Sequence, residues 1–169
     1  AIITATFPPV LKDFMEQYGL ADHCLFADFT EDPDILIRHK VSIQYSEMYL
    51  EEIAKQGKTK KVLVICNTVS RAQEVYEKLR ERNDSVWLLH SRFIRRDRNL
   101  LEQKIMEFSE SDEAGIWVTT QIVEASLDID FDILHTEMCT ADSLLQRMGR
   151  CNRKGRRIPE LSNKIGRAS

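Results

Sequence analysis

The residue types and spacing that most clearly suggest chemistry lie near the end of the chain, where residues 146–153 read QRMGRCNR. On a helix, Gln146, Arg150 and Arg153 fall at positions i, i+4 and i+7 and therefore share one narrow face. Apolar residues on the opposite face would dock this helix while the two guanidiniums project outward together. Guanidiniums match the oxygen geometry of phosphate better than lysine does. The segment predicts an anion site, with a solvated basic helix face as the alternative.

The charge distribution supports an anion partner near this segment. The 169 residues carry a formal net charge of −3, but residues 147–167 contain eight basic residues against one acidic residue, which leaves −10 for the remainder. A basic end on an acidic body indicates a local anion partner. A disordered, solvated tail is an equally good interpretation from Arg156 onward, and residues 158–169 are expected to form a basic tail.

Apolar runs and amphipathic segments alternate from residue 61 onward. The predicted strands are 62–66, 86–89, 116–118 and 131–134, and the predicted helices are 70–82, 95–108 and 140–153. This alternation predicts an α/β fold, a parallel sheet with right-handed crossovers and helices on both faces. Ligands of such sheets gather at the carboxyl ends of the strands, where this chain has small or polar residues.

The first 60 residues are less regular. A helix is predicted from Pro8 to about Tyr18, a strand over 35–45, and a helix that Ser46 caps and that stops before Gly57. An acidic, proline-containing turn at residues 30–34 separates these segments. We place a domain boundary near residue 30.

Gly57-Lys58-Thr59 resembles the end of a phosphate-binding loop but lacks its context. The full pattern requires a glycine five residues earlier, where this chain has Glu52, and the loop should follow a strand and open a helix. We therefore interpret Gly57 as a helix-terminating glycine. The chain alone is not expected to cradle a nucleoside triphosphate.

The cysteines and histidines predict neither a metal site nor a disulfide framework. The four cysteines are widely spaced without a C-x-x-C pair, and the four histidines show no ligand spacing. A reduced, cytoplasmic setting is therefore favoured. No signal peptide and no apolar span of about 18 residues occurs, so no membrane contact is expected.

Five separated segments resemble, in order and spacing, the later motifs of superfamily-two helicases. They are Thr4-Ala5-Thr6, Asn67-Thr68, His90-Ser91-Arg92-Phe93, residues 119–130 and residues 146–153. The residues within these segments are most similar to those of the helicase of type I CRISPR interference nucleases. The resemblance implies a second RecA-like motor lobe over residues 31–157, preceded over residues 1–30 by the tail of the first lobe and a linker.

The resemblance also implies a role in handling ATP. Arg150 and Arg153 match arginine fingers, which reach the γ-phosphate of ATP and contribute about 10³–10⁵ in rate. Gln146 matches a residue near that phosphate or the attacking water. Asp128 matches the carboxylate that faces the ribose, with an ordinary loop aspartate as the alternative. ATP and Mg2+ would be held mainly by the first lobe, whose motifs are absent from this sequence.

A second set of residues matches nucleic-acid contacts of the family. Asn67, Thr68, Thr119 and Thr120 correspond to positions near the phosphates of the tracked strand, and backbone contacts of this kind are blind to sequence. Thr68 and Thr120 have helix capping as their alternative. Arg92 could also touch the strand, but a solvated arginine at a helix end is the favoured interpretation.

The resemblance extends to the whole protein of which this chain would be a part. Thr4 and Thr6 match a motif that couples hydrolysis to lobe motion. The expected partners are single-stranded DNA, the first helicase lobe, a nuclease domain and the CRISPR RNA-guided surveillance complex, whereas the chain alone is expected to be inactive. The alternatives are an RNA helicase, a restriction-type translocase, or a helicase-derived scaffold that binds without turnover.

Overall fold

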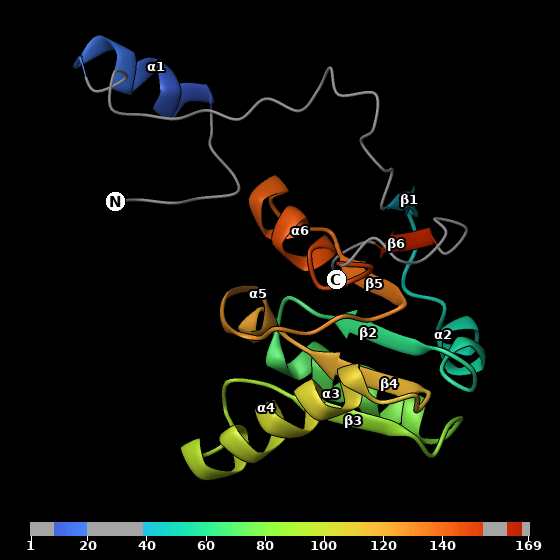
Figure 1. Ribbon diagram of the computed structural model, residues 1–169. Helices are drawn as coiled ribbons and strands as arrows, with labels where there is room; N and C mark the ends of the chain where they lie inside the picture. The colour runs from blue at the N-terminus through green and yellow to red at the C-terminus, as the bar shows by residue number, and fades with distance from the viewer. Residues whose placement is uncertain (1–8, 20–38, 154–161, 167–169) are drawn as a thin grey trace. The chain divides into compact units, whose positions relative to one another are not determined.

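The computed structural model describes residues 9–19, 39–153 and 162–166, and the chain divides into two compact units, residues 1–36 and 37–169 (Figure 1). The first unit contains helix α1 (Pro9–Gln17), close to the predicted bounds. The elements of the second unit are β1 (Lys40–Ile43), α2 (Leu50–Gln56), β2 (Lys61–Ile65), α3 (Val69–Arg80), β3 (Val86–Leu89), α4 (Arg95–Glu110), β4 (Gly115–Thr119), α5 (Ile122–Ser126), β5 (Ile133–Glu137), α6 (Ala141–Met148) and β6 (Ser162–Gly166).

The six described strands form one parallel sheet in the order β1-β6-β5-β2-β4-β3 (Figure 1). Every residue of β2, β4 and β5 is buried. Continuous burial is expected where helices cover both faces of a parallel sheet. The predicted α/β fold with a parallel sheet is therefore confirmed.

Alternate residues of the central strand β2 enter two separate cores. Val62 and Val64 belong to a cluster with buried residues of α2 and α3, whereas Leu63 and Ile65 belong to a cluster with buried residues of α4 and α5. Successive side chains of a strand point to opposite faces. Helices α2 and α3 therefore cover one face of the sheet, and α4 and α5 cover the other.

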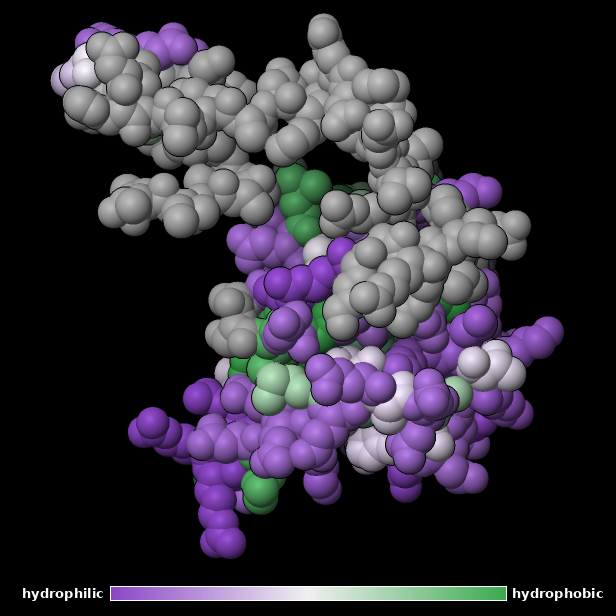
Figure 2. Space-filling model, viewed as in Figure 1, coloured by the Kyte–Doolittle hydropathy of each residue, from purple (hydrophilic) through white to green (hydrophobic). Residues whose placement is uncertain are grey.

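The outer surfaces of the covering helices are polar. Figure 2 shows mainly hydrophilic side chains over α4, while Ile105 and Phe108 of this helix are buried against the sheet. The strand residues Trp87 and Trp117 stack with ring centroids 5.7 Å apart, next to Phe108. No helix within the described ranges is long and apolar enough to cross a membrane.

Local contacts explain the start of helix α3 and the end of helix α2. Helix α3 begins at Val69, one residue before the predicted start, because the hydroxyl of Thr68 caps it by accepting the N–H of Arg71 at 3.2 Å. Helix α2 does end at Gly57, as predicted, and a Cβ there would lie 2.3 Å from Cγ1 of Ile116. Gly57 is therefore a helix end packed against the sheet and not part of a phosphate-binding loop.

The helix predicted to run to Arg153 is wrong in its last turn. Helix α6 ends at Met148, and Gly149 is its C-cap. The chain then pairs with the segment before β5: Cys151 bridges Phe131, and Asn152 turns the backbone with a φ of 47°. Asparagine tolerates this left-handed conformation better than most residues do. Backbone pairing with Phe131 thus replaces helix continuation.

The expected basic tail is also wrong for residues 162–166, which form β6. This strand lies between β1 and β5, and Ile165 pairs with Ile43 on one side and Thr136 on the other. Ile165 is almost completely buried. The short polar segment becomes a strand because two neighbouring strands supply partners for its backbone groups, which local sequence does not reveal.

Candidate functional site: a strand edge and an arginine group

Residues predicted to bind nucleic acid gather at the carboxyl edge of the sheet. Asn67 and Thr68 follow β2, Thr120 follows β4 and Met138 follows β5. The side chain of Gln121 donates a hydrogen bond to the Asn67 carbonyl at 2.8 Å, and Asn67 Nδ2 donates to the Met138 carbonyl at 2.9 Å. The carboxyl ends of three strands are thus joined, at the edge where parallel sheets bind ligands.

The three threonines at this edge differ in exposure. Thr68 is exposed and caps α3, so its hydroxyl lies at the surface next to the first N–H groups of a helix. Thr119 is fully buried and its hydroxyl donates to the Thr120 carbonyl at 3.3 Å. Thr120 is 3% exposed. The side chain of Thr119 is not available at the surface, because this residue ends a strand that is covered on both faces, and a strand contact at Thr119 stays a prediction for its backbone.

Asn67 has internal partners for each of its polar groups. Besides the two contacts above, its N–H donates to Glu137 Oε2 at 2.6 Å and its Oδ1 accepts Nη2 of Arg147 at 3.1 Å. The side chain of Asn67 is therefore committed within the lobe. These bonds hold the loop that presents Thr68, and contact between Asn67 and nucleic acid stays a prediction.

The other residues of the helicase-like motifs lie in different surroundings. Arg92 is exposed after β3. His90 is buried and stacks on Phe93 with ring centroids 4.3 Å apart. Burial lowers the pKa of His90, and the positive charge of Arg92 lowers it further. His90 is therefore a packed side chain at the end of β3. Thr4 and Thr6 lie outside the described residues.

Arg150, a predicted finger, does not project outward from a helix as expected. It is half-buried, and its Nη1 and Nη2 donate to the carbonyls of Leu127 at 2.6 Å and Glu124 at 2.5 Å. Burial lowers the pKa of Arg150, and the positive charge of Arg153 lowers it further. Two carbonyl oxygens therefore hold the guanidinium of Arg150 in place.

Arg153, the second predicted finger, lies at the surface. Its Nη1 donates to Asp128 Oδ1 at 2.6 Å, with side chains 44% and 84% exposed, and its backbone N–H donates to Asp130 Oδ1 at 2.9 Å. An exposed ion pair contributes about 0–1 kcal/mol, so another anion can replace the carboxylate at low cost. We call Arg150, Arg153 and Asp128 the arginine group.

The arginine group and the carboxyl edge are built from different residues. The N–H of Phe131, which precedes β5, donates to the Arg150 carbonyl at 3.0 Å, whereas Met138 follows β5. The guanidinium of Arg150 reaches the Glu124 carbonyl on α5, the helix that follows β4. Gln146 is exposed on α6, and because the helix ends at Met148 it shares no helical face with the arginines.

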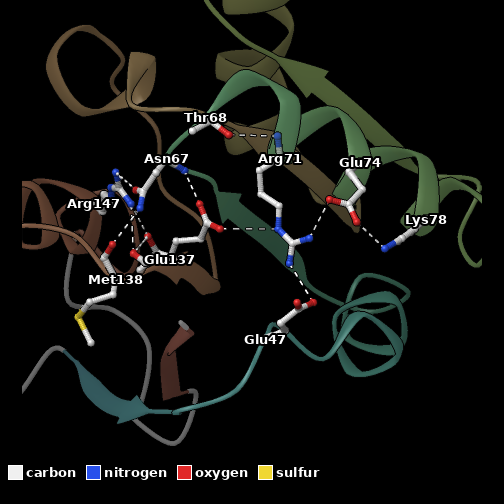
Figure 3. Close-up of polar contacts among 10 residues, drawn as sticks. Glu47, Asn67, Thr68, Arg71, Glu74, Lys78, Glu137, Met138 and Arg147 are labelled. Atoms are coloured by element: carbon white, nitrogen blue, oxygen red, sulfur yellow. Dashed lines mark hydrogen bonds and ion pairs between the residues drawn. The ribbon is translucent and has the colours of Figure 1, made fainter. Parts of the chain in front are cut away.

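Sequence reasoning missed Arg147, which is 1% exposed at the centre of a buried polar network (Figure 3). Its Nε donates to Glu124 Oε1 at 2.7 Å, its Nη1 to Thr136 Oγ1 at 2.7 Å and to the Glu137 carbonyl at 3.3 Å, and its Nη2 to Asn67. The network therefore reaches from α5 to the carboxyl edge. A single planar guanidinium makes all of these bonds.

A periodic signal for the burial of Arg147 was present in the sequence. Leu144, Arg147, Met148 and Cys151 follow the spacing i, i+3, i+4, i+7, which is the inward stripe of a helix. Arginine is rarely buried unless it is paired. Its acidic partner on α5 cannot be identified from spacing, so the interpretation required the structure.

A second arginine closes the other side of the network. Arg71 lies 3.7 Å from Glu137 Oε1 and also pairs with Glu47 and Glu74, and Figure 3 shows its guanidinium pointing toward all three carboxylates. Cys66 precedes this edge, and burial raises the pKa of its thiol to about 12. A protonated thiol is a weak nucleophile, and the charged side chains at this edge pair with one another.

Comparison with known proteins agrees with the motif resemblance. The family model described as "CRISPR-associated nuclease/helicase Cas3, C-terminal" matches residues 58–156. The chain is 31% identical over 164 residues to the CRISPR-associated nuclease/helicase Cas3 of Methanothermobacter thermautotrophicus, covering 90% of this chain and 20% of the relative. It is 40% identical over 112 residues to the endonuclease/helicase Cas3 of Escherichia coli K12, covering 62% and 13%.

Solved structures show the same relationship. The T. fusca Cas3-AMPPNP crystal structure aligns with a TM-score of 0.66 at 25% identity, covering 78% of this chain and 18% of that one. A structure described as a CRISPR RNA-guided surveillance complex, pre-nicking, aligns with a TM-score of 0.61 at 25% identity, covering 83% and 20%. The chain spans only 13–20% of the curated relatives named above. The chain belongs to the Cas3 family of CRISPR-associated nuclease/helicases, and it is a RecA-like C-terminal helicase lobe of that family.

Proposed function

We propose that this chain is the second motor lobe of an ATP-dependent helicase that translocates along single-stranded DNA in CRISPR antiviral defence. The observation that carries the proposal is the surface pair of Arg153 and Asp128 beside Arg150. These are the residues that match the two fingers and the ribose carboxylate of superfamily-two helicases. A degenerate scaffold would have no need to keep all three.

The arginine group would act on a nucleotide presented by the first lobe. T. fusca Cas3 has been crystallised with ATP, AMPPNP and ADP, which supports ATP as the nucleotide here. Bound ATP supplies the γ-phosphoryl group, with Mg2+ held mainly by the first lobe. Arg153 would exchange Asp128 for a γ-phosphate oxygen, and Arg150 would add a second, fixed positive charge. Preorganised charge of this kind stabilises the transition state of phosphoryl transfer.

Release from Arg153 gives Asp128 a second role. With its ion pair broken, the carboxylate can accept hydrogen bonds from the ribose hydroxyls. Gln146, exposed on α6, would contact the γ-phosphate or the attacking water once the lobes close. The exchange of one weak ion pair for nucleotide contacts makes lobe closure dependent on ATP.

The strand would cross the carboxyl edge of the sheet. Thr68 offers a surface hydroxyl and the first N–H groups of α3, a 12-residue helix whose N-terminus favours anions. The backbone around Thr120 and the exposed Arg92 would contact further phosphates. Contacts to phosphates alone do not depend on sequence, as a translocating motor requires. The threonines Thr4 and Thr6 would couple hydrolysis to movement of the lobes.

The names of the relatives support the larger partners. The relatives are nuclease/helicases, so we infer a nuclease domain and a first helicase lobe in the intact protein. The similarity to a chain of a surveillance complex structure supports recruitment by a CRISPR RNA-guided complex. This chain would supply the fingers and half of the strand track to that assembly.

The proposal is tested by Arg153→Ala in the full-length protein. We expect DNA-stimulated ATP hydrolysis to fall by about 10³-fold or more, the range for arginine fingers. Arg82→Ala is the matched control, because Arg82 is also an exposed arginine paired with a carboxylate, Glu81 at 3.3 Å. The control should keep its activity within about twofold, since exposed pairs contribute little. Equal activity of the two variants would refute the finger assignment.

The nature of the strand is tested with the wild-type protein. We expect ATP hydrolysis to be stimulated by single-stranded DNA more than by RNA or duplex DNA. A strong RNA preference would favour the RNA helicase alternative. Binding of nucleic acid without any hydrolysis would favour a scaffold.

A further inference from the structure

Resting on the proposed function, we propose that Arg147 is a positioning residue that transmits occupancy of the strand site at Thr68 to the finger Arg150 through Glu124. Arg147 contacts neither nucleotide nor strand in this arrangement, because it is 1% exposed. Its side chain bonds both to Glu124, whose backbone carbonyl holds Arg150, and to Asn67 at the carboxyl edge.

On the finger side, Glu124 holds two arginines at once. Its carboxylate accepts Nε of Arg147 at 2.7 Å and the hydroxyl of Ser143 at 3.2 Å. Its backbone carbonyl accepts Nη2 of Arg150 at 2.5 Å. A shift of α5 that follows Arg147 therefore moves an oxygen that holds the finger.

On the strand side, Arg147 holds the residue before Thr68. Nη2 of Arg147 donates to Asn67 Oδ1 at 3.1 Å, and Asn67 also binds Glu137 through its N–H at 2.6 Å. A phosphate bound by Thr68 would pull on this loop. Because Asn67 has its polar groups bonded inside the lobe, a displacement of the loop is passed on to Arg147 and is not absorbed by a free side chain.

Figure 3 shows the guanidinium of Arg147 directed at Asn67 and at the end of β5 around Glu137. The bond from Nη1 to Thr136 Oγ1, at 2.7 Å, adds a fixed point on β5. A guanidinium presents its donors in one rigid plane, so it cannot follow one partner without changing its bonds to the others. Burial keeps these charge-assisted bonds from being screened by solvent. The four residues Asn67, Arg147, Glu124 and Arg150 therefore form one connected path.

Stability alone does not explain the buried ion pair of Arg147 and Glu124. Replacing a buried ion pair by well-packed apolar residues of similar volume is often neutral or stabilising. Coupling between sites requires instead a physical element to which both sites are connected. The path through Arg147 has that property, since its ends bond to a finger and to the loop of a strand-binding residue.

Arg147→Lys in the full-length protein tests the proposal. Lysine keeps the charge and can pair with Glu124, but its single ammonium cannot also hold Asn67 and Thr136 in the geometry of the guanidinium fork. We expect the ratio of DNA-stimulated to basal ATP hydrolysis to fall at least fivefold. Basal hydrolysis and the Kd for single-stranded DNA should each stay within about twofold.

The matched control is Arg71→Lys. Arg71 is 13% exposed, and its carboxylate partners are Glu47, Glu74 and Glu137, on the side of the network away from Glu124. A charge-paired arginine is again changed to lysine at the same edge, but the bonds from Arg147 to Glu124 and Asn67 are untouched. This variant should keep the wild-type stimulation ratio.

A second variant covers the case in which Arg147→Lys fails to fold. Glu124→Gln keeps the backbone carbonyl that holds Arg150 and removes the charge that holds Arg147, so it should lower the stimulation ratio by a similar factor. The double variant should be no worse than either single variant if the two residues act along one path.

The possible results separate the two proposals. A stimulation ratio unchanged in both Arg147→Lys and Glu124→Gln overturns the path. A parallel loss of basal hydrolysis, DNA binding and folding also overturns it, because that is the pattern of a purely structural residue. If the wild-type protein shows no DNA-stimulated hydrolysis at all, the proposed function fails together with the path that rests on it.

Discussion

Three arginines within seven residues differ in their surroundings more than in their chemistry. Arg147 is 1% exposed and bonded on all sides, Arg150 is half-buried against carbonyl oxygens, and the side chain of Arg153 is 44% exposed beside a carboxylate. An exposed ion pair is cheap to exchange, whereas a buried charge that loses its partner is costly. Burial therefore divides the three into an arginine fixed in the interior, one held by carbonyl oxygens and one at the surface beside a carboxylate.

The carboxylate of Asp128 gives a residue-scale prediction. Asp128→Asn removes the charge that pairs with Arg153 and weakens hydrogen bonding to a ribose hydroxyl. A hydrogen bond to a charged group is worth about 1.5–3 kcal/mol, so we expect KM for ATP in the full-length protein to rise about tenfold or more. Because the aspartate is 84% exposed, thermal stability should stay unchanged.

Asp112→Asn is the control for this prediction, since Asp112 is an exposed aspartate just after α4. Its KM for ATP should equal that of the wild type in steady-state ATPase assays. A normal KM for Asp128→Asn would mean that this carboxylate serves only as an ion-pair partner.

At the scale of elements, Thr68 at the start of α3 caps the helix and is also proposed to bind a phosphate of the strand. Thr68 caps the helix, and Thr140 caps α6 through the N–H of Ser143 at 3.4 Å. Loss of a threonine cap costs about 1 kcal/mol. Thr68→Ala and Thr140→Ala should therefore lower the free energy of unfolding by similar amounts in urea titrations of the 169-residue chain.

Only one of these caps is expected to bind the strand. In the full-length protein, Thr68→Ala should raise the Kd for single-stranded DNA about tenfold, as expected for loss of a hydrogen bond to a phosphate, whereas Thr140→Ala should change it less than twofold. Fluorescence anisotropy of a labelled oligonucleotide measures both. Equal Kd values would reduce Thr68 to a helix cap.

Strand β6 provides a second prediction at this scale. Ile165 and Ile43 are register partners on β6 and β1, but Ile165 is 1% exposed and Ile43 is 53% exposed. Replacing a buried isoleucine by alanine costs about 2–5 kcal/mol. Ile165→Ala should therefore destabilise the chain by that amount, and Ile43→Ala by less than about 1 kcal/mol.

Tryptophan fluorescence is a suitable signal for these unfolding measurements, because both tryptophans of the chain, Trp87 and Trp117, lie in the lobe core. A negligible effect of Ile165→Ala would indicate that residues 162–166 behave as a tail in solution.

At the scale of the whole molecule, the lobe carries only part of an ATP site. The sequence has two candidate fingers and a candidate ribose carboxylate but no G-x-x-x-x-G-K-[ST] loop. We therefore expect the purified 169-residue chain to hydrolyse no ATP, while the full-length protein does so. If the chain and its Arg153→Ala variant hydrolyse ATP equally, the activity comes from a contaminant. If the variant loses an activity that the chain shows, the prediction is contradicted.

Much of the lobe was predictable because its signals are local. The continuous apolar run before Cys66, the helix end at Gly57 and the inward residues of α3 each follow from a few neighbouring side chains. The motif residues Thr68, Asp128, Arg150 and Arg153 were also identifiable, since the resemblance depends on residue types and order. These features need no knowledge of which distant segments meet.

Tertiary contacts decided the remainder. Arg147 fits the apolar stripe of its helix, but its burial depends on Glu124 and Asn67, which are 23 and 80 positions away. The last turn of the predicted helix was lost to pairing with Phe131, and residues 162–166 became a strand because β1 and β5 flank them. The sequence alone therefore determined the alternation of elements and the identity of the motifs. The structure decided which arginines are fixed and which are exposed, because burial and pairing depend on segments that only folding brings together.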